Sequence, residues 1–144
     1  MSAMTISQRL VDWQAGLATG AIPEDRLADG RRRLLDTLGV ILVGSRQPLG
    51  ESVLTAARRL GRGDEARCLP SGQRLPAASA ALVHGTLAHA TDFDDTHNAT
   101  LLHPSGPVVA AALAMAEACQ RDGRDLLEAI VIGNEIGCRL AMIA

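Results

Sequence analysis

The sequence predicts an all-α, helical bundle-like domain, for three reasons. Apolar residues recur at helical spacing through most of the 144 residues. Hydrophobic residues make up 47% of the chain and aromatics only 1%, so the core must consist of small and aliphatic side chains that let helices approach closely. Only residues 66–69 have the character of a strand, and that segment is short. We therefore expect one compact domain spanning residues 1–144.

Two helices are expected in the first third of the chain. The first covers Ser7–Ala18, and Gly20 ends it. The second begins near Pro23, a residue favoured in the first turn, and acidic residues that complement the helix dipole follow it. The arginines at 31–33 are expected on its solvated face. Its expected buried stripe consists of Leu27, Leu34, Leu35, Leu38, Ile41 and Leu42.

Segments rich in glycine and proline separate the remaining helices. A short amphipathic helix is expected over Glu51–Leu60, followed by a surface loop over residues 61–76. The next segment, AASAALVHGTLAHA, is expected to form a helix inside the domain because its side chains are very small. Further helices are expected over approximately Pro107–Arg121 and over Asp125–Ala144. The last one has neither a glycine C-cap nor a polar tail, which predicts that it packs on a partner or continues into more protein.

Composition argues against several classes of function. The formal net charge of −2 does not supply the positive field of a nucleic-acid-binding protein, so we expect no nucleic-acid partner. All 14 basic residues are arginine, which excludes a Schiff-base, general-base or P-loop lysine on this chain. The cysteines form no CxxC pair and indicate free thiols. Without a visible signal peptide or an uninterrupted apolar span, we expect a cytoplasmic protein that does not enter a membrane.

The stretch richest in chemically active residues is HATDFDDTHNATLLHPSGP, residues 89–107. Its alternating polar residues resemble an EF-hand calcium loop, but the sixth position is His97 rather than Gly and the twelfth is His103 rather than Glu. The DxDD motif of class II terpene cyclases is also present, but so few aromatics cannot shelter carbocations. The histidines at 89, 97 and 103 with Asp92 match no dedicated metal-binding spacing. We therefore expect no bound metal.

An acid/base site is better supported by the same residues. If the preceding helix persists through residue 96, His89, Asp92 and Thr96 share one face, whereas Asp94 points elsewhere. Crowded carboxylates raise one another's proton affinity, so that one of them can take a proton from carbon near neutral pH. His103 can serve as the paired acid or proton shuttle. The alternative is a structural role, since Asp, Thr and Asn are common at helix ends.

The start of the next helix is a candidate anion site. Pro104 biases His103 toward an extended conformation, which places His103 on a loop. Ser105 or Gly106 then caps the helix that Pro107 opens. Free N–H groups at a helix N-terminus attract anions, including carboxylates. Ser105 and Gly106 are therefore expected substrate-binding residues.

Several segments resemble the MmgE/PrpD family. The matching text is AALVHGTLAHATDFDDTH, LLHPSGPVVAAALAMAEA and GRDLLEAIVIGNEIGCRL, and the earlier RRRLLDTLGVILVGS resembles the family's second helix. The family includes 2-methylcitrate dehydratase, cis-aconitate decarboxylase and iminodisuccinate epimerase. The resemblance implies a helical domain and lyase chemistry on small polycarboxylates, without a metal or an organic cofactor.

The resemblance also implies roles for individual residues. Active-site positions of the decarboxylase branch match Asp92, Thr96 and His103 of this sequence. Asp92 is then expected to handle a proton or hold substrate, and His103 to act as an acid/base residue. Thr96 is expected to bind a substrate carboxylate through its hydroxyl.

Family members are longer, and the resemblance covers their N-terminal part. Their other active-site residues include lysines, a tyrosine and a later histidine, whereas this chain contains no Lys or Tyr. Because an acidic cluster is a poor host for a polyanion, cationic groups must come from elsewhere. We therefore expect an incomplete helical domain that carries a partial site and has little activity alone. The alternatives are one half of a split enzyme that needs a partner chain, or a non-catalytic helical module that forms homodimers or regulates a longer relative.

Overall fold

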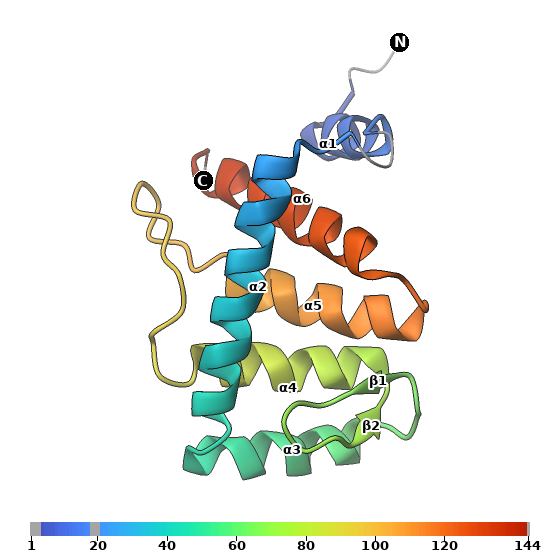
Figure 1. The fold of residues 1–144 in the computed structure, drawn as a ribbon, viewed down its shortest axis with the longest axis vertical. Helices are drawn as coiled ribbons and strands as arrows, with labels where there is room; N and C mark the ends of the chain where they lie inside the picture. The colour runs from blue at the N-terminus through green and yellow to red at the C-terminus, as the bar shows by residue number, and fades with distance from the viewer. Residues whose placement is uncertain (1–3, 18–20, 144) are drawn as a thin grey trace.

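A computed structural model of the chain describes residues 4–17 and 21–143 and shows a mostly helical domain (Figure 1). Two short strands, β1 (Ala66–Arg67) and β2 (Arg74–Leu75), pair antiparallel. The all-α prediction is thus confirmed, apart from this small hairpin. The described residues form six helices: α1 (Ile6–Ala15), α2 (Glu24–Gly44), α3 (Pro48–Leu60), α4 (Ala77–His89), α5 (Ser105–Ala118) and α6 (Gly123–Ala141).

Local capping signals set the starts of the first and last helices. Thr5 accepts a hydrogen bond from the backbone N–H of Gln8, and the Gln8 side chain accepts one from the backbone of Thr5, which forms a capping box before α1. The Asp122 side chain accepts two backbone N–H bonds at the start of α6. The expected ends of these helices, Ala18 and Ala144, lie outside the described residues.

Helices α3, α4, α5 and α6 lie side by side, and α2 crosses the stack (Figure 1). The most extensive contact joins α4 and α5, the two helices with the smallest side chains. This contact confirms that the AASAALVHGTLAHA segment lies inside the domain. The loop of residues 90–104 connects α4 to α5, so the packing of these helices positions the histidine- and aspartate-rich stretch.

Glycine permits the closest approach between α2 and α4. A Cβ atom built on Gly44 would lie 2.1 Å from the backbone carbonyl oxygen of Leu87, far inside van der Waals contact. A similar approach joins α6 to α5, where a Cβ on Gly133 would lie 2.7 Å from Cγ1 of Val108. Because Leu87 lies in the last turn of α4, the first of these contacts also fixes the end from which the loop departs.

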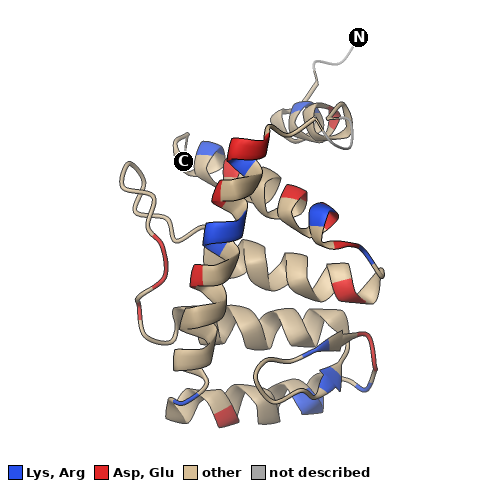
Figure 2. Cartoon of the chain, in the orientation of Figure 1, with Lys and Arg blue, Asp and Glu red and all other residues tan. Residues whose placement is uncertain are grey.

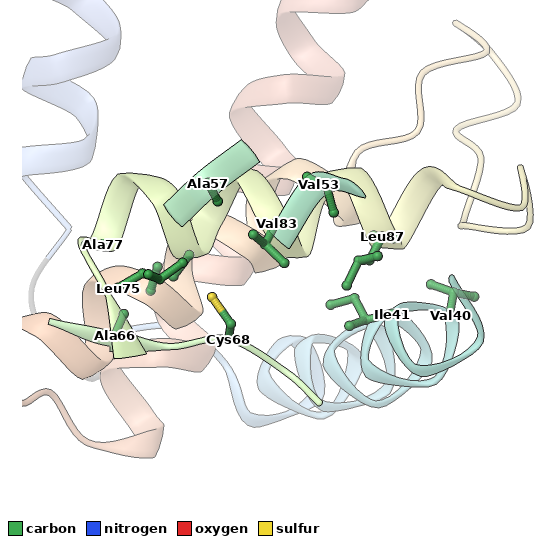
Figure 3. Close-up of a cluster of buried hydrophobic side chains, with 13 residues drawn as sticks. Val40, Ile41, Val53, Ala57, Ala66, Cys68, Leu75, Ala77, Val83 and Leu87 are labelled. Atoms are coloured by element: carbon green, nitrogen blue, oxygen red, sulfur yellow. The ribbon is translucent and has the colours of Figure 1, made fainter. Parts of the chain in front are cut away.

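A cluster of buried aliphatic side chains joins α2, α3, α4 and the hairpin (Figure 3). Ala66, Cys68 and Leu75 of the hairpin segment are at most 7% exposed. The prediction of a surface loop over residues 61–76 is therefore wrong for these residues, because pairing of the two strands turns their apolar side chains toward the helices. Burial raises the pKa of the Cys68 thiol, which is free as expected.

The buried face of α2 differs from the expected leucine stripe. Leu27 and Ile41 are buried as predicted, but Leu35 is 73% and Leu42 50% exposed. Smaller residues face the neighbouring helices instead, because α2 crosses them at close range and leaves little room for leucine side chains. The additional buried residues are Gly30, Thr37, Val40 and Gly44.

Charged side chains are distributed unevenly over the helices (Figure 2). None lies on α4, and α5 carries only Glu117, whereas α2, α3 and α6 carry both signs. The scarcity of Asp, Glu and Arg on α4 and α5 fits their central place in the stack. Within the described residues, none of the helices combines the length and apolarity needed to span a bilayer.

Candidate functional site

The loop of residues 90–104 carries the candidate site, and it is not helical where the sequence predicted. Helix α4 ends at His89, and Asp92 has φ of 51°, a left-handed conformation that interrupts a right-handed helix. The expected alignment of His89, Asp92 and Thr96 on one helical face is therefore wrong. The Asp92 side chain is 79% exposed, and Thr96 is also exposed on the loop.

Asp94, which was expected to point away from the site, is the buried carboxylate at its centre. Its side chain is only 2% exposed, and its Oδ1 lies 3.0 Å from Nδ1 of His89 and 3.3 Å from Nδ1 of His103. The two imidazole rings meet edge to face, with centroids 5.2 Å apart and planes inclined by 72°. Two histidines, one at the end of α4 and one just before α5, therefore converge on one oxygen atom.

A second carboxylate, that of Asp95, anchors the loop to the helices. Ser105 donates its backbone N–H to Oδ1 at 3.0 Å and its hydroxyl to Oδ2 at 2.7 Å. Arg33 of α2 donates to the same Oδ2 at 2.6 Å. Oδ1 of Asn134, on α6, lies 3.1 Å from the Ser105 hydroxyl oxygen. Asp95 thus joins the loop to α2 and α5, and through Ser105 to α6.

Arg33 is not on the solvated face that the sequence predicted. Its side chain is 35% exposed and also donates to Asp29 at 2.9 Å. Burial acts to lower the pKa of Arg33, but the hydrogen bond and charge of Asp29, together with the charge of Asp95, leave it raised overall. The guanidinium is therefore a permanent cation whose contacts hold the loop, and the arginines at 31–33 do not behave as one group.

The start of α5 is occupied by the chain's own carboxylates. The helix begins at Ser105, before the expected Pro107, and both the N–H and the hydroxyl of Ser105 are bound to Asp95. Gly106 is also buried, and a Cβ atom built there would lie 3.1 Å from Oδ2 of Asp94. The positive end of the α5 dipole favours both carboxylates. The substrate-binding roles of Ser105 and Gly106 remain predictions.

The environments of His89 and His84 shift their pKa values in opposite directions. The pKa of His89 is raised, first by its hydrogen bond to Asp94, then by the negative charges of Asp94 and Asp92. In contrast, burial lowers the pKa of His84, which lies within α4 and accepts a hydrogen bond from the backbone N–H of Leu69. His89 therefore favours the imidazolium form beside Asp94, whereas His84 favours the neutral form in the core.

Four side chains in the loop region also meet the geometric requirement for a cation site. Each offers one ligand atom, and these atoms lie within 4.8 Å of one another: His89, Asp92, Asp94 and His103. His97, a candidate from its sequence position, is not among them. Its Nδ1 lies 2.8 Å from Oγ1 of Thr100. Imidazole and carboxylate ligands suit divalent transition metals, and the same groups suit proton exchange. The predicted absence of a metal stays a prediction.

Sequence reasoning missed Asp94 and Arg33 as parts of this site. The error over Asp94 came from extending the helical period past His89, since the left-handed turn at Asp92 changes which aspartate points inward. The spacing of Asp29 and Arg33 is that of an i, i+4 ion pair and gave a signal for their contact. No local signal connects Arg33 to Asp95, which is far away in the sequence.

The fold and the site together define a class of protein: a helical domain in which one interhelical loop gathers acid/base groups against the start of a helix. The sequence profile of the MmgE/PrpD N-terminal domain matches residues 8–144, and the chain belongs to this family. The resemblance of the quoted segments is thereby confirmed.

Two curated relatives are similar over most of the chain. It is 34% identical over 135 residues to the cis-aconitate decarboxylase of Homo sapiens, a match that covers 90% of this chain and 28% of the relative. It is 29% identical over 142 residues to the cis-aconitate decarboxylase-like protein oryM of Aspergillus oryzae (strain ATCC 42149 / RIB 40), with 94% and 30% covered. The chain thus spans less than a third of the length of these relatives.

Proposed function

We propose that residues 89–106 form one wall of a lyase site for small polycarboxylates, with His103 as an acid/base residue. The observation that carries the proposal is the convergence of His89 and His103 on the buried carboxylate of Asp94. It occurs in a family with relatives named for the decarboxylation of cis-aconitate. An imidazole can both accept and donate a proton near neutral pH, which suits the role of an acid/base residue.

Both decarboxylation and dehydration of such substrates need a residue that transfers a proton. In a decarboxylation, loss of carbon dioxide leaves a carbanion that must receive a proton, which an imidazolium can donate. In a dehydration, a base removes the proton from the carbon next to a carboxylate before the hydroxyl group leaves. In this proposal His103 serves both reactions. Asp92, which has a ligand atom within 4.8 Å of one on His103, is the proposed second proton-handling or substrate-holding group.

The exposed part of the loop is the proposed substrate face. Asp92 and Thr96 are exposed, and Oδ1 of Asp92 lies 4.0 Å from Nε2 of His89. The Thr96 hydroxyl can donate a hydrogen bond to a substrate carboxylate. A polyanionic substrate also needs cationic partners, and the guanidinium of Arg33 is engaged by Asp29 and Asp95. We propose that another polypeptide segment supplies these cations.

Binding of cis-aconitate to the ¹⁵N-labelled chain tests the proposal. We expect weak binding, with amide shift changes concentrated in residues 89–106. Binding should strengthen as the pH falls, because His89, whose pKa is raised, becomes a cation that attracts a polyanion. Changes confined to other parts of the chain, or none with a concentrated ligand, would refute the proposed site.

We expect little turnover of cis-aconitate or 2-methylcitrate by these 144 residues alone, because the cationic groups are missing from the wall described above. Carbon dioxide release and formation of the unsaturated product measure the two reactions. Efficient turnover that is lost in Asp92→Asn would contradict the expectation of a partial site.

A second candidate is a helical module that associates with another copy of itself. Large apolar side chains at the end of α6 favour it, since Leu140, Met142 and Ile143 are 42%, 67% and 69% exposed. Multi-angle light scattering should then give twice the mass of the chain. A monomer at all concentrations that also captures no partner would exclude this candidate.

A further inference from the structure

We propose that Asp94 is a positioning residue that holds His103 and His89 by their Nδ1 atoms and thereby leaves Nε2 of His103 free for proton transfer. The inference rests on the proposed function for the role of His103. The positioning itself is a property of the chain without substrate. It concerns a residue to which neither the motif nor the family resemblance assigned a role.

Burial distinguishes Asp94 from its neighbour in the motif. The side chain of Asp94 is 2% exposed and that of Asp92 is 79% exposed. A buried carboxylate requires partners that replace its lost hydration. The ion-pair contacts of Asp94 among the described residues are with two imidazoles and with no arginine. The buried charge of Asp94 therefore acts on the histidines, whereas water screens that of Asp92.

The contacts favour one tautomer of each imidazole ring. An ionised carboxylate only accepts hydrogen bonds, so an Nδ1 atom bound to it must carry a hydrogen. In the neutral imidazole, Nε2 is then unprotonated and available as a base. His89 satisfies this geometry at 3.0 Å. His103 approaches the same oxygen at 3.3 Å, so both rings are expected as the Nδ1–H tautomer.

The Nδ1 of His103 has no competing acceptor. The atom is buried, and no other group in the described part of the chain completes a well-aligned hydrogen bond to it. Its contact with Asp94 at 3.3 Å is long and imperfectly aligned, as catalytic hydrogen bonds often are before substrate binds. A buried N–H donor without a partner is costly, which favours tightening of this contact rather than its loss.

The fold holds Asp94 in this place from three directions. The next residue, Asp95, is fixed by Ser105 and Arg33, so the backbone on that side cannot rotate freely. On the other side, Nδ1 of His89, at the end of α4, lies 3.0 Å from Oδ1 of Asp94. Behind the carboxylate, the missing side chain of Gly106 lets Oδ2 approach closely, since a Cβ atom built there would lie 3.1 Å from it. The dipole of α5 favours the negative charge.

Tautomer states measured by long-range ¹H–¹⁵N NMR correlation test the inference on the whole chain. At about pH 8.5, well above the ordinary histidine pKa of roughly 6.5, we expect His103 and His89 to carry the hydrogen on Nδ1. In Asp94→Ala this preference should be lost for His103, giving a mixture of tautomers. Asp94→Asn should retain it, because the amide oxygen still accepts a hydrogen bond, and should lower the pKa of His89 because the charge is gone.

Asp92→Asn is the matched control, since it removes a carboxylate from the same loop without contacting Nδ1 of His103. It should leave the His103 tautomer unchanged. An Nε2–H tautomer for His103 in the unmodified chain would overturn the inference, as would an unchanged tautomer in Asp94→Ala. If Asp94→Ala does not fold, the His103 tautomer in the unmodified chain and in Asp94→Asn still tests the inference. A failure of cis-aconitate to bind would refute the proposed function and leave the tautomer result intact.

Discussion

Replacing Gly44 with alanine tests the packing that sets the end of α4 and hence the start of the loop. The new Cβ atom would lie 2.1 Å from the carbonyl oxygen of Leu87 and 2.9 Å from its carbonyl carbon. Carbon atoms in contact prefer about 3.5–4.0 Å, so α2 and α4 must separate by roughly 1 Å. Because both atoms belong to the backbone of α4, no side-chain rotation can relieve the overlap.

The expected cost lies at the upper end of the range for overpacked cores, about 3 kcal/mol. For a chain of this size, each kcal/mol lowers Tm by roughly 2–4 °C, so Gly44→Ala should melt about 6–12 °C below the unmodified chain. Thermal unfolding followed by circular dichroism measures this difference.

Gly39→Ala is the matched control on the same helix. A Cβ atom at Gly39 meets no other atom within 4 Å, so the higher helix propensity of alanine should stabilise the protein by about 0.5–1 kcal/mol. Equal Tm values for the two variants would refute the close approach of α2 to α4.

Three further outcomes are expected. Asp95→Ala should lower the free energy of unfolding in urea by about 1–3 kcal/mol, since it leaves the donors of Ser105 without their acceptor. A loss below about 0.5 kcal/mol would show that the hydrogen bonds of Asp95 do not stabilise the fold. The raised pKa of His89 means that its contribution to stability is full below the unfolded pKa of about 6.5 and is lost as pH rises through the folded value. As the pH rises through this interval, the Tm of His89→Gln should therefore fall less than that of the unmodified chain. Identical profiles of Tm against pH would contradict the contact of His89 with Asp94. Leu35 is 73% exposed and Ile41 is fully buried. Leu35→Gln should therefore change the free energy of unfolding by less than about 0.5 kcal/mol, whereas Ile41→Ala should lower it by about 2–5 kcal/mol. A larger loss for Leu35→Gln than for Ile41→Ala in urea unfolding would contradict the observed buried face of α2.

Local patterns were enough to predict the helices but not all of their contacts. Apolar periodicity and the glycine and proline positions located each helix to within a few residues, because these signals act through neighbouring residues. The hairpin was missed as a core element because its strands have only two residues each. Their burial depends on packing against helices from other parts of the chain.

The motif was located correctly, but the inward-facing carboxylate was not. A helical period continued from His89 selects Asp92, whereas the left-handed backbone at Asp92 brings Asp94 inward. Such a conformation is uncommon for a residue other than glycine and leaves no clear trace in the sequence. The contact of Arg33 with Asp95 likewise depends on how α2 crosses α5, which no local pattern specifies.

The most direct test of the account is the response of the His103 side-chain nitrogens to cis-aconitate, followed by ¹⁵N NMR in the whole chain. If Asp94 holds Nδ1 and the substrate meets Nε2, the ligand should shift the Nε2 resonance strongly and the Nδ1 resonance weakly. His84, which is buried within α4 and lies outside the proposed wall, serves as the internal reference. Equal shifts at His84 and His103, or a response limited to Nδ1 of His103, would contradict the assignment of His103 as the acid/base residue of a polycarboxylate site.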